Sequence, residues 1–298
     1  MSNNTIMLAR WGMQAELERI WRICFDEEKR PTDFFFNNAF RPQDCLIYRA
    51  GEHIAAMVHM LPAAIAQDGK AVQAHYIYGA ATLPEYRSRG YMGALLRCAG
   101  HVGLRRGDRF SFLLPASRGL YDYYAGYGYA PNFQTRFVTV SAEELRRISA
   151  GYSRRRVLLT YRQMNRLRGE LLLKRDGSAL WDERALAYAD GINRRYGGAR
   201  VCFGEAGETA YAFCRMAGPG LCEVTELMSR PETLPGLAAN LLSAIPAQSY
   251  RIRLPGGGPL FEGRGKVSHF GMIKPLGGIT IQKMIQGSNR PYLGLTLD

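Results

Sequence analysis

The spacing of apolar residues predicts both helices and strands in the first half of the chain. Apolar side chains recur every three or four residues over 13–26 and over 92–99, which is typical of helices with one buried face. Other stretches alternate apolar and polar residues and end in turn signals, which is typical of strands. The expected strands are TIMLARWG (5–12), the two halves of 45–65, HYIYGAAT (75–82), FSFLLPAS (110–117) and FQTRFVTVS (133–141).

The second half of the chain echoes the first. RGYMGALL (89–96) aligns with PGLAANLL (235–242), and FSFLLP (110–115) aligns with YRIRLP (250–255). In each half, the aligned segments belong to a stretch with the order strand, helix, strand, and this shared order supports an internal repeat. We therefore predict two copies of one αβ fold, residues 1–148 and 149–298, of which the second is degenerate.

Composition places the chain among globular proteins. It has 298 residues, of which 47% are hydrophobic, and this is enough to bury a sizeable core. No apolar run approaches the roughly 20 residues of a membrane-spanning helix, and the first residues lack the apolar core of a signal peptide. Six cysteines are scattered without zinc-site spacing, so we expect reduced thiols, no metal site and a cytoplasmic protein.

The chain is basic, with a formal net charge of +13. Six arginines fall between residues 154 and 168 without one acidic residue. They could form an electrostatic footprint for an anionic ligand or nucleic acid. The alternative, which we favour, is a solvated linker and helix face, so nucleic acid is not expected to be a partner.

Residues 83–96, LPEYRSRGYMGALL, stand where an expected strand turns into a helix. A helix N-terminus offers about four unpaired backbone N–H groups and a partial positive charge, which together suit an anion. Gly90 permits a tight turn and close approach of a phosphate, while Arg87 and Arg89 can add charged hydrogen bonds. The segment fits neither the Rossmann nor the P-loop pattern. It is either a pyrophosphate cradle or an ordinary basic turn.

These segments resemble the GNAT acyltransferase superfamily. Arg87-Ser88-Arg89-Gly90 fits the start of its Arg/Gln-x-x-Gly-x-Gly/Ala signature, with Met92 at the next small position and Gly93 one step late. This form is similar to the Eis-like branch, which has tandem GNAT domains, but the chain leaves no room for that branch's sterol-carrier-like domain. The resemblance implies an α/β (α+β) fold of two tandem GNAT domains. Each would have a mixed, mostly antiparallel sheet flanked by helices, and only the first would bind acetyl-CoA.

The resemblance also implies site residues by matched position. In the family, the strand before the motif presents backbone groups to the pantetheine arm, and a tyrosine in a Tyr-x-x-x-Gly-Phe ending lies near the thioester sulfur. Here Tyr124 to Tyr129 fit that ending, and Ser117 precedes Tyr124 by two helical turns. The residues implied to bind acetyl-CoA are Ala80, Ala81, Thr82, Arg87, Ser88, Arg89, Gly90, Tyr91, Met92, Gly93 and Ser117.

Acetyl transfer to an amine needs a neutral nitrogen, a polarised thioester carbonyl and a proton for the departing thiolate. A tyrosine with a pKa near ~10 can protonate a thiolate whose thiol has a pKa near ~8.5, so Tyr124 is the candidate acid. No carboxylate lies on the strand HYIYGAAT to act as base. In the Eis-like branch the terminal carboxylate reaches the active site, which makes Asp298 a candidate. The alternatives are a purely structural tail, with His75 or a water chain as base.

Three functions remain open on the sequence. The first is an acetyl-CoA-dependent N-acetyltransferase that acts on a small-molecule or peptide amine. The second is a non-catalytic GNAT-fold protein that binds CoA or nucleic acid. The third is an aminoacyl-tRNA-dependent transferase, although the added helical arm of such proteins is not seen. The acceptor and the oligomeric state cannot be read from the sequence.

Overall fold

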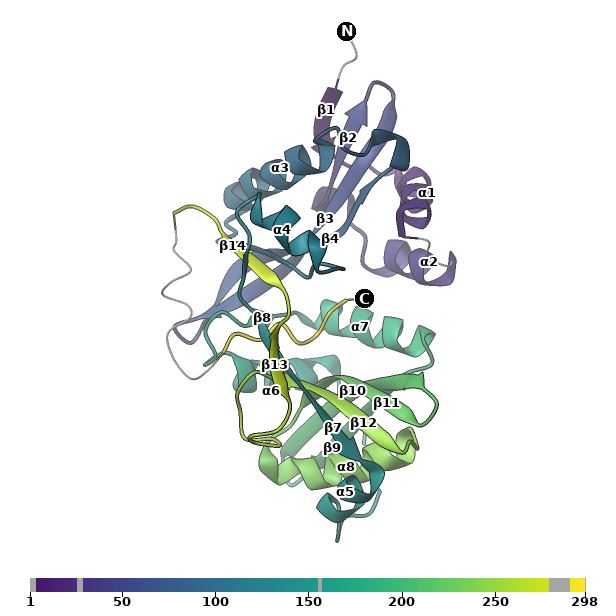
Figure 1. Ribbon diagram of the computed structural model, residues 1–298, viewed down its shortest axis with the longest axis vertical. Coiled ribbons are helices and arrows are strands. Elements are labelled where there is room, and N and C mark those ends of the chain that lie inside the picture. Colours follow the sequence, from purple (N-terminus) through teal and green to yellow (C-terminus); the bar gives the residue numbers. More distant parts are fainter. Residues whose placement is uncertain (1–3, 26–28, 155–156, 279–289, 298) are drawn as a thin grey trace. The chain divides into compact units, whose positions relative to one another are not determined.

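The computed structural model describes residues 4–25, 29–154, 157–278 and 290–297. The chain forms two compact units (Figure 1). Unit 1 contains the described residues among 1–65, 72–131 and 271–281, and unit 2 contains those among 66–71, 132–270 and 282–298. Each unit has one sheet with helices packed against it, so the expected α/β class and the two mixed sheets flanked by helices are confirmed.

The sheet of unit 1 has the strand order β1-β2-β3-β4-β5-β14-β6. Its antiparallel pairs include β1 with β2, β2 with β3, and β14 with both β5 and β6, whereas β4 and β5 run parallel. The last two residues of the long strand β3, Ala66 and Gln67, belong to unit 2, and the backbone of Ala66 is hydrogen-bonded to Gly177 and Ser178. The strands are β1 (Asn4–Leu8), β2 (Cys45–Ala50), β3 (His53–Gln67), β4 (Lys70–Thr82), β5 (Phe110–Leu113), β6 (Ala130–Pro131) and β14 (Met272–Pro275).

Helices cover both faces of the sheet in unit 1 (Figure 1). On one face, Leu95 and Leu96 pack with Val58 and Ile77 in a continuous core. On the other face, aromatic rings of the first two helices surround His59 of β3. The helices are α1 (Gln14–Phe25), α2 (Lys29–Asn38), α3 (Tyr91–Arg106) and α4 (Gly119–Ala125), with short 3-10 turns η1 (Pro42–Asp44) and η2 (Pro84–Tyr86).

The sheet of unit 2 has the order β13-β7-β12-β11-β10-β9, in which only β11 and β12 are paired in parallel. Leu237 and Leu241 of α8 pack with Val224 and Ile252 in the core on one face. The elements are β7 (Gln134–Ser141), α5 (Ala142–Ile148), α6 (Tyr161–Leu172), β8 (Ala179–Leu180), α7 (Glu183–Arg195), β9 (Ala199–Glu205), β10 (Glu208–Gly218), β11 (Leu221–Met228), η3 (Pro231–Thr233), α8 (Leu234–Ala244), β12 (Ser249–Pro255) and β13 (Lys266–His269).

The two halves of the sequence exchange strands. Strand β7, from the first half, pairs with β12 in the sheet of unit 2, while β14, from the second half, pairs with β5 in the sheet of unit 1. The units therefore do not follow the expected boundary between residues 148 and 149. The stretch HFGMIKPL (269–276) is divided between the two sheets, because β13 ends at His269 in one sheet and β14 starts at Met272 in the other.

The repeat seen in the sequence is present in the fold. Strand β4, helix α3 and strand β5 form a parallel pair joined through a helix, and β11, α8 and β12 do the same. Leu95 and Leu241, which the alignment pairs, are both buried. All six cysteines are free thiols, and four of them are buried, as expected.

Candidate functional site

The parallel strands of unit 1 separate before β4 ends. Their register runs from Ala74–Phe110 to Tyr76–Phe112, but β4 continues to Thr82. The segment that the resemblance assigns to the pantetheine arm, residues 80–82, lies beyond the last of these pairs. Backbone groups on that side of β4 are therefore the ones that a bound molecule could reach.

Gly79 sits at this point with a left-handed backbone, φ +55°, inside the strand. Such a residue within a strand is typical of a β-bulge, and bulges often redirect a strand beside an active site. A Cβ on Gly79 would lie 2.1 Å from the Trp21 ring, so a larger residue does not fit. Gly79 is not among the site residues expected from the sequence, although a glycine within a strand pattern is a signal for a bulge.

The Gly79→Ala variant tests this close contact. We expect the free energy of unfolding to fall by about 3 kcal/mol, because left-handed strain and overpacking against Trp21 add together. Gly51→Ala is the matched control, since Gly51 has φ +67° but no atom within 4 Å of its Cβ position. Its expected loss is about 1 kcal/mol. Equal losses in urea denaturation would contradict the proposed role of the Trp21 contact.

The loop before α3 has the geometry of an anion site. Gly90 is the N-cap of the helix with φ +78°, and no side chain caps the helix start. Ser88 also has a positive φ, +61°, which is uncommon for a residue with a side chain. No atom lies within 4 Å of the Cβ position of Gly90, so the approach to the first N–H groups of α3 is open.

The two arginines of this loop are exposed. The Nε of Arg87 donates a hydrogen bond to the carbonyl oxygen of Thr82 at 3.2 Å, which links the loop to the end of β4. The guanidinium of Arg89 lies 5.5 Å from the ring centre of Tyr86. Both side chains therefore stand beside the helix start, with N–H groups left to bind an anion.

Gly93 has a packing role that the sequence did not indicate. A Cβ on Gly93 would lie 2.2 Å from the hydroxyl of Tyr127, so the side chain of Tyr127 packs directly on α3. Tyr91 stacks on Tyr48 with 4.1 Å between the ring centres. At the start of α3, Tyr91 and Met92 are half-buried, while Gly93 is buried.

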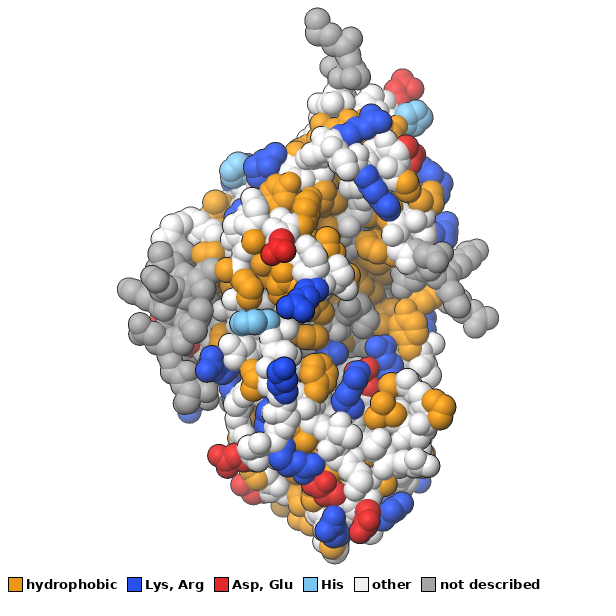
Figure 2. Space-filling view, in the orientation of Figure 1, with side chains coloured by type: hydrophobic (Ala, Val, Ile, Leu, Met, Phe, Trp, Pro, Cys, Tyr) orange, Lys and Arg blue, Asp and Glu red, His pale blue; other side chains and the backbone are white. Residues whose placement is uncertain are grey.

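A cluster of tyrosines lies on and after α4, where hydrophobic side chains gather on the face shown in Figure 2. Its members are Tyr121, Tyr123, Tyr124, Tyr127 and Tyr129. Tyr124 is 9% exposed, and its ring lies 6.0 Å from that of Tyr129. Burial raises the pKa of Tyr124, so its hydroxyl keeps its proton at neutral pH. Tyr129 instead shares a 2.7 Å hydrogen bond with Ser111 and is structural. Ser117 is exposed just before α4.

Two histidines in the sheet of unit 1, His59 and His75, are buried. His59 lies among aromatic rings, and burial lowers its pKa to about 3, so it is neutral. The Nδ1 of His75 lies 2.7 Å from a carboxylate oxygen of Asp108, and both side chains are buried. Gly103 of α3 packs against the His75 ring. This pair joins β4 to the end of α3, which is a structural arrangement.

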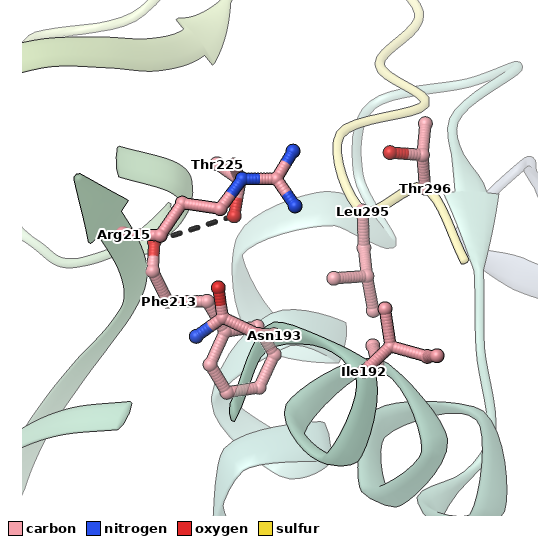
Figure 3. A pocket seen from close by; sticks show the side chains of 8 residues that line it. Ile192, Asn193, Phe213, Arg215, Thr225, Leu295 and Thr296 are labelled. Carbon is pink, nitrogen blue, oxygen red and sulfur yellow. Dashed lines mark hydrogen bonds between the residues drawn. The ribbon is translucent and has the colours of Figure 1, made fainter. Parts of the chain in front are cut away.

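Asp298, the candidate base, lies outside the described residues. The preceding segment, 290–297, is not a strand. It is nevertheless held in unit 2. Leu297 is 2% exposed, and Arg253 donates a hydrogen bond to the carbonyl oxygen of Gly294 at 3.0 Å. Leu295 and Thr296 line a cavity of about 20 Å³ beside α7, room for one water molecule (Figure 3).

The described part of the chain has neither a metal-binding cluster nor a membrane-spanning helix. Among those residues, no three or more His, Cys, Asp or Glu side chains form a group that could hold a metal ion. No helix among them has the length and apolar character needed to cross a membrane.

Comparison with known proteins places the site in context. Residues 14–131 match the family described as "Acetyltransferase (GNAT) domain". No curated protein matches the chain.

Several solved structures share the fold. A probable N-acyltransferase of unknown function from Enterococcus faecalis is 16% identical, with a TM-score of 0.71 over 93% of this chain and 73% of that one. A GCN5-related N-acetyltransferase from Kribbella flavida is 16% identical, with a TM-score of 0.72 over 91% and 71%. Eis1 from Mycobacterium abscessus is 9% identical, with a TM-score of 0.65 over 91% and 73%.

Proposed function

We propose that this chain, whose residues 14–131 match the GNAT acetyltransferase domain family, transfers an acetyl group from acetyl-CoA to a primary amine. The observation that carries the proposal is the open N-terminus of α3. Its N-cap is a left-handed glycine without a side-chain cap, and two exposed arginines flank it. Backbone N–H groups and guanidinium groups suit the pyrophosphate of a coenzyme A.

The proposed reaction is a direct attack of the neutral amine on the thioester. The pyrophosphate would bind at Gly90 and the first turn of α3, with Arg87 and Arg89 beside it. The pantetheine arm would run along residues 80–82, where β4 has separated from β5 and can offer backbone hydrogen bonds. A backbone N–H there would polarise the thioester carbonyl.

Tyr124 would then protonate the departing thiolate. The Tyr124 hydroxyl forms no hydrogen bond with another described residue, so its proton is free for transfer. Because burial raises the pKa of Tyr124, this acid stays protonated well above neutral pH. We therefore expect no loss of kcat from this group until the pH exceeds about 10.

The general base is assigned to the chain end. The side-chain carboxylate of Asp298 would accept the proton that the attacking amine loses. The residues just before Asp298 are packed in unit 2, where Leu293, Leu295 and Leu297 are buried. His75 suits the role less well because it is buried against Asp108.

Two variants of the chain end test this assignment. Asp298→Asn removes the carboxylate and keeps the shape of the side chain, and Asp298→Ala removes the polar group altogether. A loss of kcat of about 100-fold in both variants is expected, with unchanged thermal stability. Asp298→Glu, which keeps a carboxylate, is the control. Full activity in both chain-end variants would contradict the role of Asp298.

The activity itself is tested by mixing the protein with acetyl-CoA and a panel of amines, with released thiol as the readout. We expect thiol release that depends on one class among aminoglycosides, polyamines, lysine peptides and amino sugars. Thermal stabilisation by acetyl-CoA without thiol release from any amine would favour a non-catalytic binding protein. Stabilisation by tRNA instead of acetyl-CoA would favour an aminoacyl-tRNA-dependent transferase.

A further inference from the structure

A pocket of about 280 Å³ lies in unit 2 at the ends of the parallel strands β11 and β12. The register of these strands ends at Val224–Ile252, and the pocket is lined further along by Leu227, Met228 and Leu254. In unit 1, β4 and β5 separate in the same way after their last pair. The pocket thus occupies the repeat's equivalent of the gap to which we assign the pantetheine arm.

The lining of this pocket is mostly apolar, and all of its charged side chains are positive. Three arginines line it, and none of its lining residues is acidic. Arg230, at 34% side-chain exposure, is paired with Glu170 and Glu208. Arg136 is buried, and its guanidinium donates hydrogen bonds to three backbone carbonyl oxygens between residues 260 and 264. The charged groups of Arg230 and Arg136 therefore already have hydrogen-bond or ion-pair partners within the protein.

Arg175 does not have a full set of partners. Its side chain follows α6 and is 9% exposed, and its Nε has no hydrogen-bond partner among the described residues. One terminal N–H group donates to the carbonyl oxygen of Arg290 at 3.4 Å. The other terminal nitrogen lies 3.6 Å from the Cβ position of Gly258, which also lines the pocket.

A buried guanidinium without a carboxylate is costly, because its loss of hydration is not balanced by an opposite charge. Burial accordingly lowers the pKa of Arg175 from its usual range. No carboxylate of the described chain forms an ion pair with it. An anion inside the pocket would supply the missing charge and accept the free N–H.

We propose that this pocket binds a small carboxylic acid with an apolar body, whose carboxylate pairs with Arg175. The planar fork of a guanidinium matches a carboxylate with two parallel hydrogen bonds. The volume accommodates roughly nine groups of water size, so the ligand has about ten non-hydrogen atoms. This site is separate from the proposed catalytic one and does not depend on it.

Coenzyme A does not fit this second site. The start of α8 has Pro235 in place of Arg89, and a Cβ on Gly236 would lie 2.0 Å from the Phe203 ring. The start of α8 therefore lacks the open glycine turn and the matched arginines that are present at the start of α3. The repeat has therefore kept the gap between its parallel strands and lost the phosphate-binding loop.

Ligand-observed fluorine NMR on the whole protein tests the proposal, with 3-fluorobenzoate and 3-fluorobenzamide as matched probes. We expect the carboxylate to bind at least tenfold more tightly than the neutral amide, because only the carboxylate gains the charged hydrogen bonds. Hexanoate should displace 3-fluorobenzoate. Failure of 3-fluorobenzoate to bind at millimolar concentration, or equal binding of the amide, would overturn the proposal.

Three variants locate the binding. Arg175→Met should weaken 3-fluorobenzoate binding at least tenfold, and Arg184→Met, at an exposed arginine of α7 outside the pocket, should leave it unchanged. Since Arg175→Met could disturb the contact with Arg290, Leu171→Trp provides an independent test. Leu171 is half-buried in the pocket lining, and a larger ring should fill the space and abolish binding. Full binding in both variants would rule out this pocket.

Discussion

Gly90→Asp is expected to lower kcat/KM for acetyl-CoA by at least 100-fold. Asp tolerates the left-handed backbone that Gly90 adopts, so the loop should keep its shape. Its carboxylate would stand at the open helix start and repel the pyrophosphate at close range. An effect of 100-fold corresponds to about 2.7 kcal/mol, which is reasonable for two like charges that are partly shielded from water.

Gly90→Asn is the matched control, because asparagine has nearly the same shape, also tolerates φ > 0 and carries no charge. We expect kcat/KM of this variant to stay within about tenfold of the wild type, since its only added cost is local. The affinity for acetyl-CoA, measured by calorimetry, should follow the same order. Equal behaviour of the Asp and Asn variants would mean that no phosphate group binds at Gly90.

Tyr124→Phe is expected to lower kcat by about 100-fold or more and to leave the dissociation constant of acetyl-CoA unchanged. The variant removes only the proton donor, and general acid catalysis typically contributes a factor of this size. The buried ring remains and continues to pack beside Tyr129, so unfolding by urea should not change measurably.

Two other tyrosines of the cluster provide the controls. Tyr129→Phe removes a hydroxyl that bonds to Ser111, so it should reduce stability by about 1 kcal/mol with little change in kcat. Tyr123→Phe alters an exposed ring and should have little effect on either quantity. If Tyr124→Phe is fully active while one of these controls is not, the acid has been assigned to the wrong tyrosine.

Local patterns predicted much of the fold. The apolar spacing placed α1, α3 and β4 within a few residues, because each of these elements buries one face or lies fully in the sheet. The echo between α3 and α8 also predicted the repeat of two parallel strand pairs. The exchange of β7 and β14 between the sheets was not predictable, since strand partners depend on contacts that are distant in the sequence.

The candidate site was also predicted from the sequence only in part. The sequence identified the loop at Arg87–Gly90 through its residue types, and the structure adds its left-handed backbone and missing cap. The close packing of Gly79 on Trp21 and of Gly93 on Tyr127 could not be predicted, because glycine spacing alone does not reveal which ring approaches. The arginine pocket of unit 2 was also missed, since its lining comes from four stretches that are far apart in the sequence.

The central claim is that one acetyl-CoA binds per chain, at the start of α3. Calorimetric titration of the wild-type protein with acetyl-CoA tests this claim most directly. We predict a stoichiometry of one, because the start of α8 lacks both arginines and its glycine packs on Phe203. A stoichiometry of two equivalent sites, or unchanged binding in Gly90→Asp, would contradict the claim.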